Sequence, residues 1–176
     1  MRHLAAEMAS ASSPAAVDAR QLRAALGHYA TGVTIVSCVD ADGSPVGLTA
    51  NSFNSLSLEP ALVLWSLRRE SPSAPAFSAA LRFAVNVLAE SHAALSQRFA
   101  SRGVDRFAEG GWSAGEHGVP VLAGAAAVFE CETVSSQLAG DHLLFIGRVL
   151  ACRDSALRPL LFHAGHYRAL GDLLQP

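Results

Sequence analysis

Charge is scarce in this sequence. Charged residues make up 16% of the 176 residues, and the 13 basic residues are outnumbered by 15 acidic ones, for a formal net charge of −2. No run of basic residues occurs. Because nucleic acids and anionic membranes are bound through concentrated positive charge, the composition argues against both kinds of partner.

Cysteine is also scarce. Cys38, Cys131 and Cys152 are odd in number and widely spaced, and each lies in an apolar stretch typical of a strand. This pattern predicts neither a disulfide framework nor a CxxC metal site. We expect three buried thiols.

Long apolar runs are missing, although 51% of the residues are hydrophobic. No segment approaches the roughly 18 apolar residues of a membrane span, and the first 20 residues lack the apolar run of a signal peptide. The sequence therefore predicts a cytoplasmic protein without membrane contact. Its length and apolar content suffice for one compact domain.

Motifs of nucleophilic and metal-dependent catalysis are absent as well. The sequence has no G-x-S-x-G, no H-E-x-x-H and no P-loop. His163 and His166 have a spacing that metal ligands can have, but no second group of ligands accompanies them, so we expect no metal. The chemistry is therefore expected to come from an organic cofactor.

The residue pattern predicts a mostly β domain over residues 19–172, preceded by a flexible arm over residues 1–18. Two β-rich segments flank a turn and predict a hairpin over residues 33–49. Further strands are expected at 61–67, 83–88, 121–134, 143–152, 160–162 and 167–170, and helices at 20–29, 75–81 and 91–100. Strands without regular βαβ alternation predict an antiparallel, Greek-key-like barrel and disfavour a Rossmann domain.

Two polar clusters are candidate ligand contacts. Residues 47–57 gather hydroxyl and amide side chains between two strands, which suits a loop but also suits the polar edge of a flavin. Residues 66–77 carry Arg68 and Arg69 and begin a helix with Ser73 as its expected N-cap. A helix start with hydroxyls and nearby arginines can bind a phosphate, so one phosphorylated ligand could span both clusters.

Six segments taken together resemble the short-chain flavin reductase family. They are residues 29–36, 47–57, 71–73, 82–88, 140–142 and 165–168, and the resemblance covers about residues 20–171. It implies an FMN-binding split β-barrel that forms a homodimer and transfers a hydride from NADH or NADPH to FMN or FAD. It also implies that a separate flavin-dependent monooxygenase receives the reduced flavin.

The resemblance also implies roles for individual residues. The flavin ring and ribityl chain are expected to contact Pro45, Val46, Gly47, Leu48, Thr49, Ala50, Asn51 and Ser52, and Ser66, Leu67 and Arg68 continue this wall. The flavin phosphate is expected at Ser71, Pro72 and Ser73, with Arg98 and Phe99 closing the far side. The nicotinamide is expected to face His142, His166, Tyr167 and Arg168.

Hydride transfer requires positioning more than acid–base chemistry. His142 is therefore expected to orient the nicotinamide as a hydrogen-bond donor, and amide donors are expected to stabilise charge on the reduced flavin. One departure from the family concerns the phosphate motif: many relatives have Arg and Thr where this chain has Pro72 and Ser73. The loss of that cation leaves the choice between FMN and FAD open.

The same barrel also hosts other functions, because a fold does not determine a function. The alternatives are a non-catalytic flavin-binding or haem-binding protein and an oxidase that retains its flavin. Consumption of NADH with added free flavin separates the reductase from these alternatives.

Overall fold

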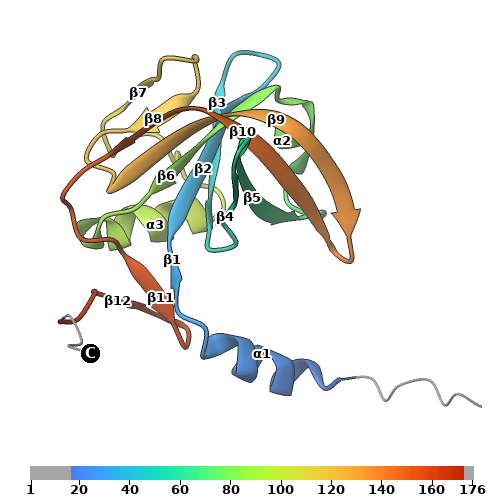
Figure 1. The fold of residues 1–176 in the computed structure, drawn as a ribbon, viewed down its shortest axis with the longest axis vertical. Coiled ribbons are helices and arrows are strands. Elements are labelled where there is room, and N and C mark those ends of the chain that lie inside the picture. The colour runs from blue at the N-terminus through green and yellow to red at the C-terminus, as the bar shows by residue number, and fades with distance from the viewer. Residues whose placement is uncertain (1–16, 173–176) are drawn as a thin grey trace, which may run out of the picture.

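The computed structural model describes residues 17–172 (Figure 1). Residues 1–16 of the predicted arm lie outside the described residues, and the domain boundary at residue 19 stays a prediction. The described chain is dominated by strands, and its paired strands run antiparallel. The predicted mostly β, antiparallel fold is confirmed.

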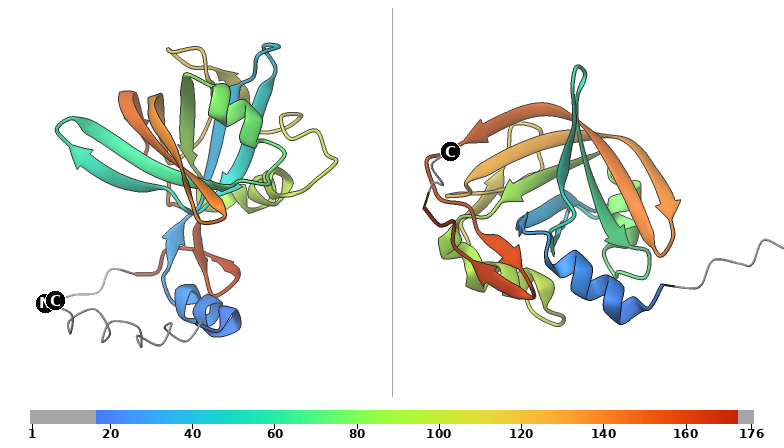
Figure 2. Two further views of the ribbon diagram at one scale, coloured as in Figure 1. Left: turned by 90° about the vertical axis from the view of Figure 1, so that its right-hand side faces the viewer. Right: turned by 60° about the horizontal axis from the view of Figure 1, so that its bottom comes forward.

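A curled seven-stranded sheet forms the body of the molecule. Its strands are β2 (Thr34–Val39), β3 (Pro45–Ala50), β4 (Asn54–Leu58), β5 (Ala61–Arg68), β6 (Arg82–Val87), β9 (Ala127–Ala139) and β10 (His142–Asp154). Their order in the sheet is β3-β2-β6-β9-β10-β5-β4. The sheet curls so far that the chain following β3 returns to β5, as Figure 2 shows from two further directions.

Two small sheets and short helices complete the fold. The first sheet pairs β1 (Thr31–Gly32), β11 (Leu161–His163) and β12 (His166–Arg168), and the second pairs β7 (Trp112–Ala114) with β8 (Pro120–Leu122). The helices are α1 (Ala19–Gly27), α2 (Ala74–Ala79), the 3₁₀-helix η1 (Glu90–His92) and α3 (Ala93–Ala100). In Figure 1, α1 and the β11–β12 hairpin lie together at one side of the curled sheet.

The element predictions were wrong at several places, and the two-residue strand β1 was also not predicted. The polar residues that follow the predicted hairpin suit a loop, but Asn54–Leu58 forms the edge strand β4. The expected strand at 121–134 is two strands, β8 and β9, separated by a turn in which Gly124 has a φ of +71°. The short strand β7 was not predicted, because Trp112–Ala114 carries no alternating pattern. The predicted hairpin over 33–49 is confirmed as β2 and β3.

Alternation along β5 builds one half of the core. Val63, Trp65 and Leu67 are buried, and the residues between them are more exposed. The Trp65 indole stacks on the Phe145 ring with 4.6 Å between ring centroids and meets Phe77 of α2 edge-on at 4.9 Å. This aromatic cluster fixes α2 against the sheet, and so places the segment between β5 and α2.

A second core cluster packs α3 against the sheet and β8. Phe99 of α3 is fully buried and contacts the Phe107 and Trp112 rings. Gly47 of β3 lies under this cluster, because a Cβ atom there would lie 2.8 Å from the Phe99 ring. Close packing of α3 on β3 therefore requires glycine at position 47.

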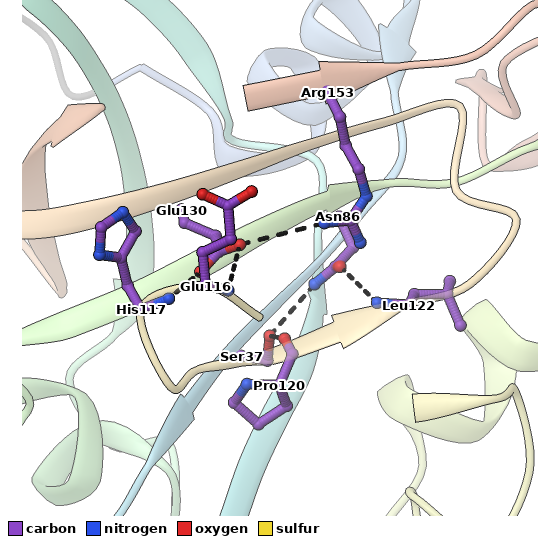
Figure 3. Close-up of polar contacts among 8 residues, drawn as sticks. All are labelled: Ser37, Asn86, Glu116, His117, Pro120, Leu122, Glu130 and Arg153. Atoms are coloured by element: carbon purple, nitrogen blue, oxygen red, sulfur yellow. Dashed lines mark hydrogen bonds and ion pairs between the residues drawn. The ribbon is translucent and has the colours of Figure 1, made fainter. Parts of the chain in front are cut away.

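Buried polar groups connect the β7–β8 hairpin to the main sheet (Figure 3). The Asn86 side-chain amide donates to the Ile35 carbonyl and to the Ser37 hydroxyl, both at 3.1 Å, and its oxygen accepts from the Leu122 amide at 2.8 Å. The Ser37 hydroxyl in turn donates to the Pro120 carbonyl at 2.6 Å. Three strands, β2, β6 and β8, are thus joined by one side chain.

Glu130 is a buried carboxylate, although the alternating sequence of β9 predicts a half-exposed strand here. Its side chain is only 3% exposed and accepts hydrogen bonds from the Glu116 and His117 amides at 3.1 and 2.8 Å (Figure 3). The Arg153 guanidinium lies 3.9 Å from it. A buried carboxylate must be paired or hydrogen-bonded, and here it holds the turn between β7 and β8 in place.

The cysteines differ from the prediction at one position. Cys38 and Cys131 are buried, but Cys152 is exposed because its side chain lies on the outer face of β10. Within residues 17–172, no group of three or more His, Cys, Asp or Glu side chains is placed to hold a metal ion. No helix in this part of the chain is long and apolar enough to cross a membrane.

Candidate functional site

A cleft of about 470 Å³ lies where the chain after β3 meets the end of β5 and the start of α2. This volume is within the range of small-molecule sites in proteins. The cleft brings together these residues from the predicted set: Leu48, Thr49, Ala50, Asn51, Ser52, Ser66, Leu67, Arg68, Ser71, Pro72, Ser73, Phe99 and His142. Four separate segments of the chain thus converge on one surface.

Seven predicted residues do not line this cleft: Pro45, Val46, Gly47, Arg98, His166, Tyr167 and Arg168. The first three belong to the part of β3 that precedes the cleft, where Gly47 packs under Phe99. Arg98 is paired elsewhere, with the Glu109 carboxylate at 2.5 Å and the Asp105 carbonyl at 3.2 Å.

The loop after β3 is tied to β5 by a single hydroxyl. Ser52 donates from Oγ to the Ser66 carbonyl at 2.8 Å, and the same Oγ accepts from the Ser66 amide at 3.0 Å. Ser52 thereby takes the place of a strand partner for β5 at this point. The hydroxyl positions Asn51 and Ala50 opposite β5, and holds the two walls of the cleft together.

Hydrogen bonds fasten β3 to α3 and to the segment after it, beside the cleft. Thr49 donates from its hydroxyl to the Ser96 carbonyl at 2.6 Å. Arg106 donates to the Gly47 carbonyl at 2.9 Å and to the Ser101 carbonyl at 2.8 Å. These bonds keep β3 at a fixed distance from α3, and Arg106 itself lines the cleft.

The segment between β5 and α2 supplies hydroxyl groups. Ser73 occupies the N-cap position of α2, as predicted, but its side chain makes no capping hydrogen bond. The Ser71 hydroxyl accepts from the Ser73 amide at 3.3 Å. Ser73 is mostly buried and its hydroxyl lines the cleft, so it is a polar group that a bound ligand can satisfy.

Besides Arg106, two arginines carry positive charge to the cleft. Arg68 ends β5, and Arg102 follows α3. Among the described residues, no carboxylate forms an ion pair with either guanidinium. Together with Ser71 and Ser73, they make this end of the cleft suitable for an anion.

The residues that sequence analysis missed are Glu70, Ala100, Arg102 and Arg106. Arg102 and Arg106 lie in the irregular segment after α3, where no periodic pattern says which way a side chain faces. The family resemblance instead implies the neighbouring Arg98, which lies in the last turn of α3. Only the tertiary fold distinguishes the arginine that pairs with Glu109 from the two that face the cleft.

His142 and Asp141 form a hydrogen-bonded pair at the edge of the cleft. The His142 Nδ1 atom lies 2.7 Å from the Asp141 Oδ1 atom. The hydrogen bond from His142 holds the pKa of the Asp141 carboxyl below its ordinary value, and the charges of His142 and Arg68 act in the same direction. His142 is paired with Arg68 across β10 and β5, which brings it beside the anion-binding end.

The predicted nicotinamide residues on β12 lie apart from the cleft of this chain. The Tyr167 hydroxyl lies 2.8 Å from the Ser96 hydroxyl, and the Tyr167 ring packs edge-on against Phe162. His166 and Arg168 are exposed. Because Ser96 also accepts from Thr49, the β11–β12 hairpin is connected to the cleft through α3.

Comparison with known proteins agrees with this geometry. Residues 26–171 match the family model described as Flavin reductase like domain. The chain is 42% identical over 154 residues to the FMN reductase (NADH) SmoA of Agrobacterium fabrum. This alignment covers 88% of this chain and 87% of that protein. It is also 42% identical over 156 residues to the reductase subunit HsaB of a flavin-dependent monooxygenase of Rhodococcus jostii. This alignment covers 88% of this chain and 80% of that protein.

A solved structure has the same fold. The Streptomyces globisporus NADH:FAD oxidoreductase SgcE6, in complex with NAD and FAD fragments, superimposes with a TM-score of 0.83 at 36% identity, covering 88% of this chain and 93% of that one. The chain spans about half, 48%, of the length of one further curated relative, to which it is 45% identical.

Proposed function

The chain belongs to the flavin reductase family, and from this premise we propose that it is an NAD(P)H:flavin oxidoreductase that supplies reduced flavin to a separate monooxygenase. The observation that carries the proposal is the composition of the cleft. A polar loop, an end whose arginines and hydroxyls suit an anion, and a histidine from a third strand line one surface. A phosphorylated ring cofactor needs these three kinds of contact.

The residues present fit a flavin. We assign Asn51, Ala50 and the backbone after β3 to the pyrimidine edge of the ring, where amide donors and acceptors are required. Ser71, Ser73 and Arg68 hold the phosphate. Ser52, Thr49 and Ser66 act by keeping these groups in position, because their polar atoms bond to the protein itself.

Flavin bound here would supply the hydride acceptor, and the protein supplies geometry. The cleft must hold the nicotinamide against the flavin ring and exclude water from the space between them. His142 lines the cleft beside the proposed ring site and is the side chain we assign to orient the nicotinamide. His166 and Arg168 stay candidates for contacts with the rest of the dinucleotide.

Both FMN and FAD remain substrates in this proposal. Pro72 and Ser73 replace a cationic phosphate motif of the family, but Arg102 brings a cation from the opposite wall of the cleft. A second cation at a distance from the first is a contact that a diphosphate can use. The proposal likewise includes both NADH and NADPH as hydride donors.

We also propose a homodimer. The β5 and β10 residues Leu64 and Ile146 are directly paired, and they alternate with the buried Trp65 and Phe145, so they lie on the face opposite the core. This outward face is apolar and only partly covered in the single chain. A second copy of the chain would bury it. The cytoplasmic location stays a prediction.

The test is a steady-state assay that crosses NADH and NADPH with FMN, FAD and riboflavin. Oxidation of the nicotinamide is expected only with added flavin, at many turnovers per subunit. A protein that binds flavin or haem without turnover, or that keeps a coloured flavin through dialysis, would contradict the reductase. A haem carrier would be identified by a Soret band.

A further inference from the structure

The Asp141–His142 pair is built by a two-residue turn. β9 ends at Ala139 and β10 begins at His142, and these two residues face each other across the hairpin. Gly140 has a φ of +63°, a left-handed conformation that glycine adopts without strain. The Asp141 carbonyl also accepts from the Arg69 amide at 3.0 Å, which fastens the turn to the segment after β5.

The chemistry of the pair determines which ring nitrogen carries the proton. An ionised carboxylate can only accept a hydrogen bond, so the Nδ1 atom of His142 must be the donor in the 2.7 Å contact with Asp141 Oδ1. In a neutral imidazole only one nitrogen carries hydrogen. In the neutral form of His142, Nε2, the nitrogen left for a ligand in the cleft, is then a hydrogen-bond acceptor.

We propose that Asp141 is a positioning residue that fixes the His142 tautomer, so that His142 Nε2 accepts a hydrogen bond from the carboxamide NH₂ group of the nicotinamide. The proposal rests on the proposed function. It makes His142 an acceptor where the sequence led us to expect a donor. It also gives Asp141, which was not among the predicted site residues, a role in selecting the dinucleotide by its amide group.

Exposure of the pair explains why this role concerns binding and not folding. The Asp141 side chain is 82% exposed and the His142 side chain 38% exposed. Exposed pairs contribute little to the stability of a folded protein. The orientation of one imidazole, however, changes which hydrogen bond a ligand can make, and this does not require a large folding energy.

The first test measures the tautomer directly. The ¹⁵N spectrum of imidazole nitrogens is recorded at alkaline pH for the wild type, for Asp141→Ala and for His142→Gln, whose missing signals identify His142. The wild type is expected to show an unprotonated Nε2, and Asp141→Ala is expected to shift the population toward Nε2–H. Protonated Nε2 in the wild type, or an unchanged tautomer in Asp141→Ala, would overturn the proposal.

The second test measures whether the His142 tautomer determines recognition of the carboxamide NH₂ group of the nicotinamide. Inhibition by NAD⁺ is compared with inhibition by its 3-acetylpyridine analogue, which keeps the carbonyl but lacks the NH₂ group. The wild type is expected to prefer NAD⁺ by about tenfold, from loss of one hydrogen bond in the cleft. In Asp141→Ala this preference should fall to nearly one, with flavin affinity unchanged.

Matched variants separate positioning from general damage. Asp154→Ala, at the other end of β10, should keep both the tautomer and the preference. Asp141→Asn keeps an oxygen that can accept from Nδ1 and should restore part of the preference. Equal inhibition by both dinucleotides in the wild type would contradict the carboxamide contact. If the wild type oxidises no NADH with any flavin, the reductase proposal fails, but the tautomer measurement still decides the role of Asp141.

Discussion

At the scale of single residues, the clearest test of the cleft is the Ser73 hydroxyl. It lines the cleft without a capping bond to α2, so Ser73→Ala removes a group that only a ligand is proposed to use. Hydrogen bonds to charged groups contribute about 1.5–3 kcal/mol, and FMN affinity should therefore fall about tenfold or more. Fluorescence titration with FMN and with riboflavin measures this change.

Riboflavin is the internal control for this variant, because it lacks the phosphate and should bind to Ser73→Ala as it does to the wild type. Ser78→Ala is the matched variant, since Ser78 is an exposed serine on the same helix and lies outside the cleft. An equal loss of affinity for both flavins would place Ser73 against the ring or in the core, and the phosphate assignment would be wrong.

The three cysteines should differ in reactivity. Burial raises the pKa of the Cys38 thiol to about 12, with the Asp40 charge adding to the effect, and burial together with the Glu130 charge raises that of Cys131 to about 12. The thiolate is the reactive form, so both should resist iodoacetamide in the folded protein. Mass spectrometry should find one modified residue, the exposed Cys152.

Labelling of the unfolded protein supplies the reference for this experiment, because all three thiols should then react. Cys152→Ser should show no fast modification when folded. Modification of Cys38 or Cys131 at the rate of Cys152 would contradict their burial.

The sequence predicted the residues whose role follows from local chemistry. Ser73 at a helix start and the polar residues that follow β3 are visible in the sequence, because capping and turn preferences act over a few positions. Arg106 and Arg102 were missed, since their use depends on contacts with Gly47 and on the course of an irregular segment. Burial of Glu130 was missed because the two amides that hold it come from a turn 13 and 14 residues earlier in the chain.

At the scale of elements, β4 shows that an exposed edge strand can be missed when its sequence is polar. Asn54–Leu58 is an edge strand exposed along most of its length, so it needs no buried face and has no alternating pattern. The strand pairs with β5 and is shifted by a bulge between Ser55 and Ser57. In contrast, β2 and β5 are packed in the core. The pattern of their apolar residues predicted both strands correctly.

The hydrogen bonds of the Asn86 side chain join β6 to β2 and β8, and their contribution to stability can be tested. Asn86→Ala leaves the Ser37 hydroxyl, the Ile35 carbonyl and the Leu122 amide without this partner in a buried site. Each unsatisfied buried group costs about 1–3 kcal/mol, so the free energy of unfolding should fall by at least about 3 kcal/mol in total. Urea denaturation at one fixed protein concentration measures it.

Asn54→Ala is the control for this change, because Asn54 is exposed and its side chain bonds only to the adjacent Ser55 amide. It should alter stability by less than about 0.5 kcal/mol. A similar loss in both variants would show that the Asn86 network does not hold the β7–β8 hairpin on the sheet.

At the scale of the whole molecule, the apolar outward face and the helix α1 lead to the same expectation. α1 has no buried residue, and its Leu22 and Leu26 are exposed at helical spacing. Light scattering should give about twice the 18.3 kDa mass of one chain. Leu64→Asp, on the outward face of β5, should reduce the mass to that of a monomer, because a charge would be buried in the interface.

Leu81→Asp is the control for the dimer, since Leu81 is 82% exposed and lies before β6, outside the β5–β10 pair. It should remain dimeric. A wild type that is monomeric at micromolar concentration and fully active would show that the pairing is not needed.

The last prediction concerns the passage of flavin through the protein. The cleft offers a ligand mainly hydroxyl, amide and guanidinium groups, and Phe99 is the one aromatic side chain that lines it in the described part of the chain. Because polar groups exchange water for a ligand with little net gain, flavin should bind with micromolar affinity, about −8 kcal/mol, and leave on a catalytic timescale. Protein purified without added flavin should thus be nearly colourless.

Release of the reduced flavin can be tested by separating the two enzymes in space. The reductase and an unrelated flavin-dependent monooxygenase are placed on opposite sides of a membrane that flavin crosses but proteins do not, under low oxygen because oxygen consumes reduced flavin. Product should form in the monooxygenase compartment, in proportion to the free flavin supplied. Product that forms only when both proteins share a compartment, with flavin retained by the reductase through dialysis, would instead show a tightly bound cofactor and transfer by direct contact.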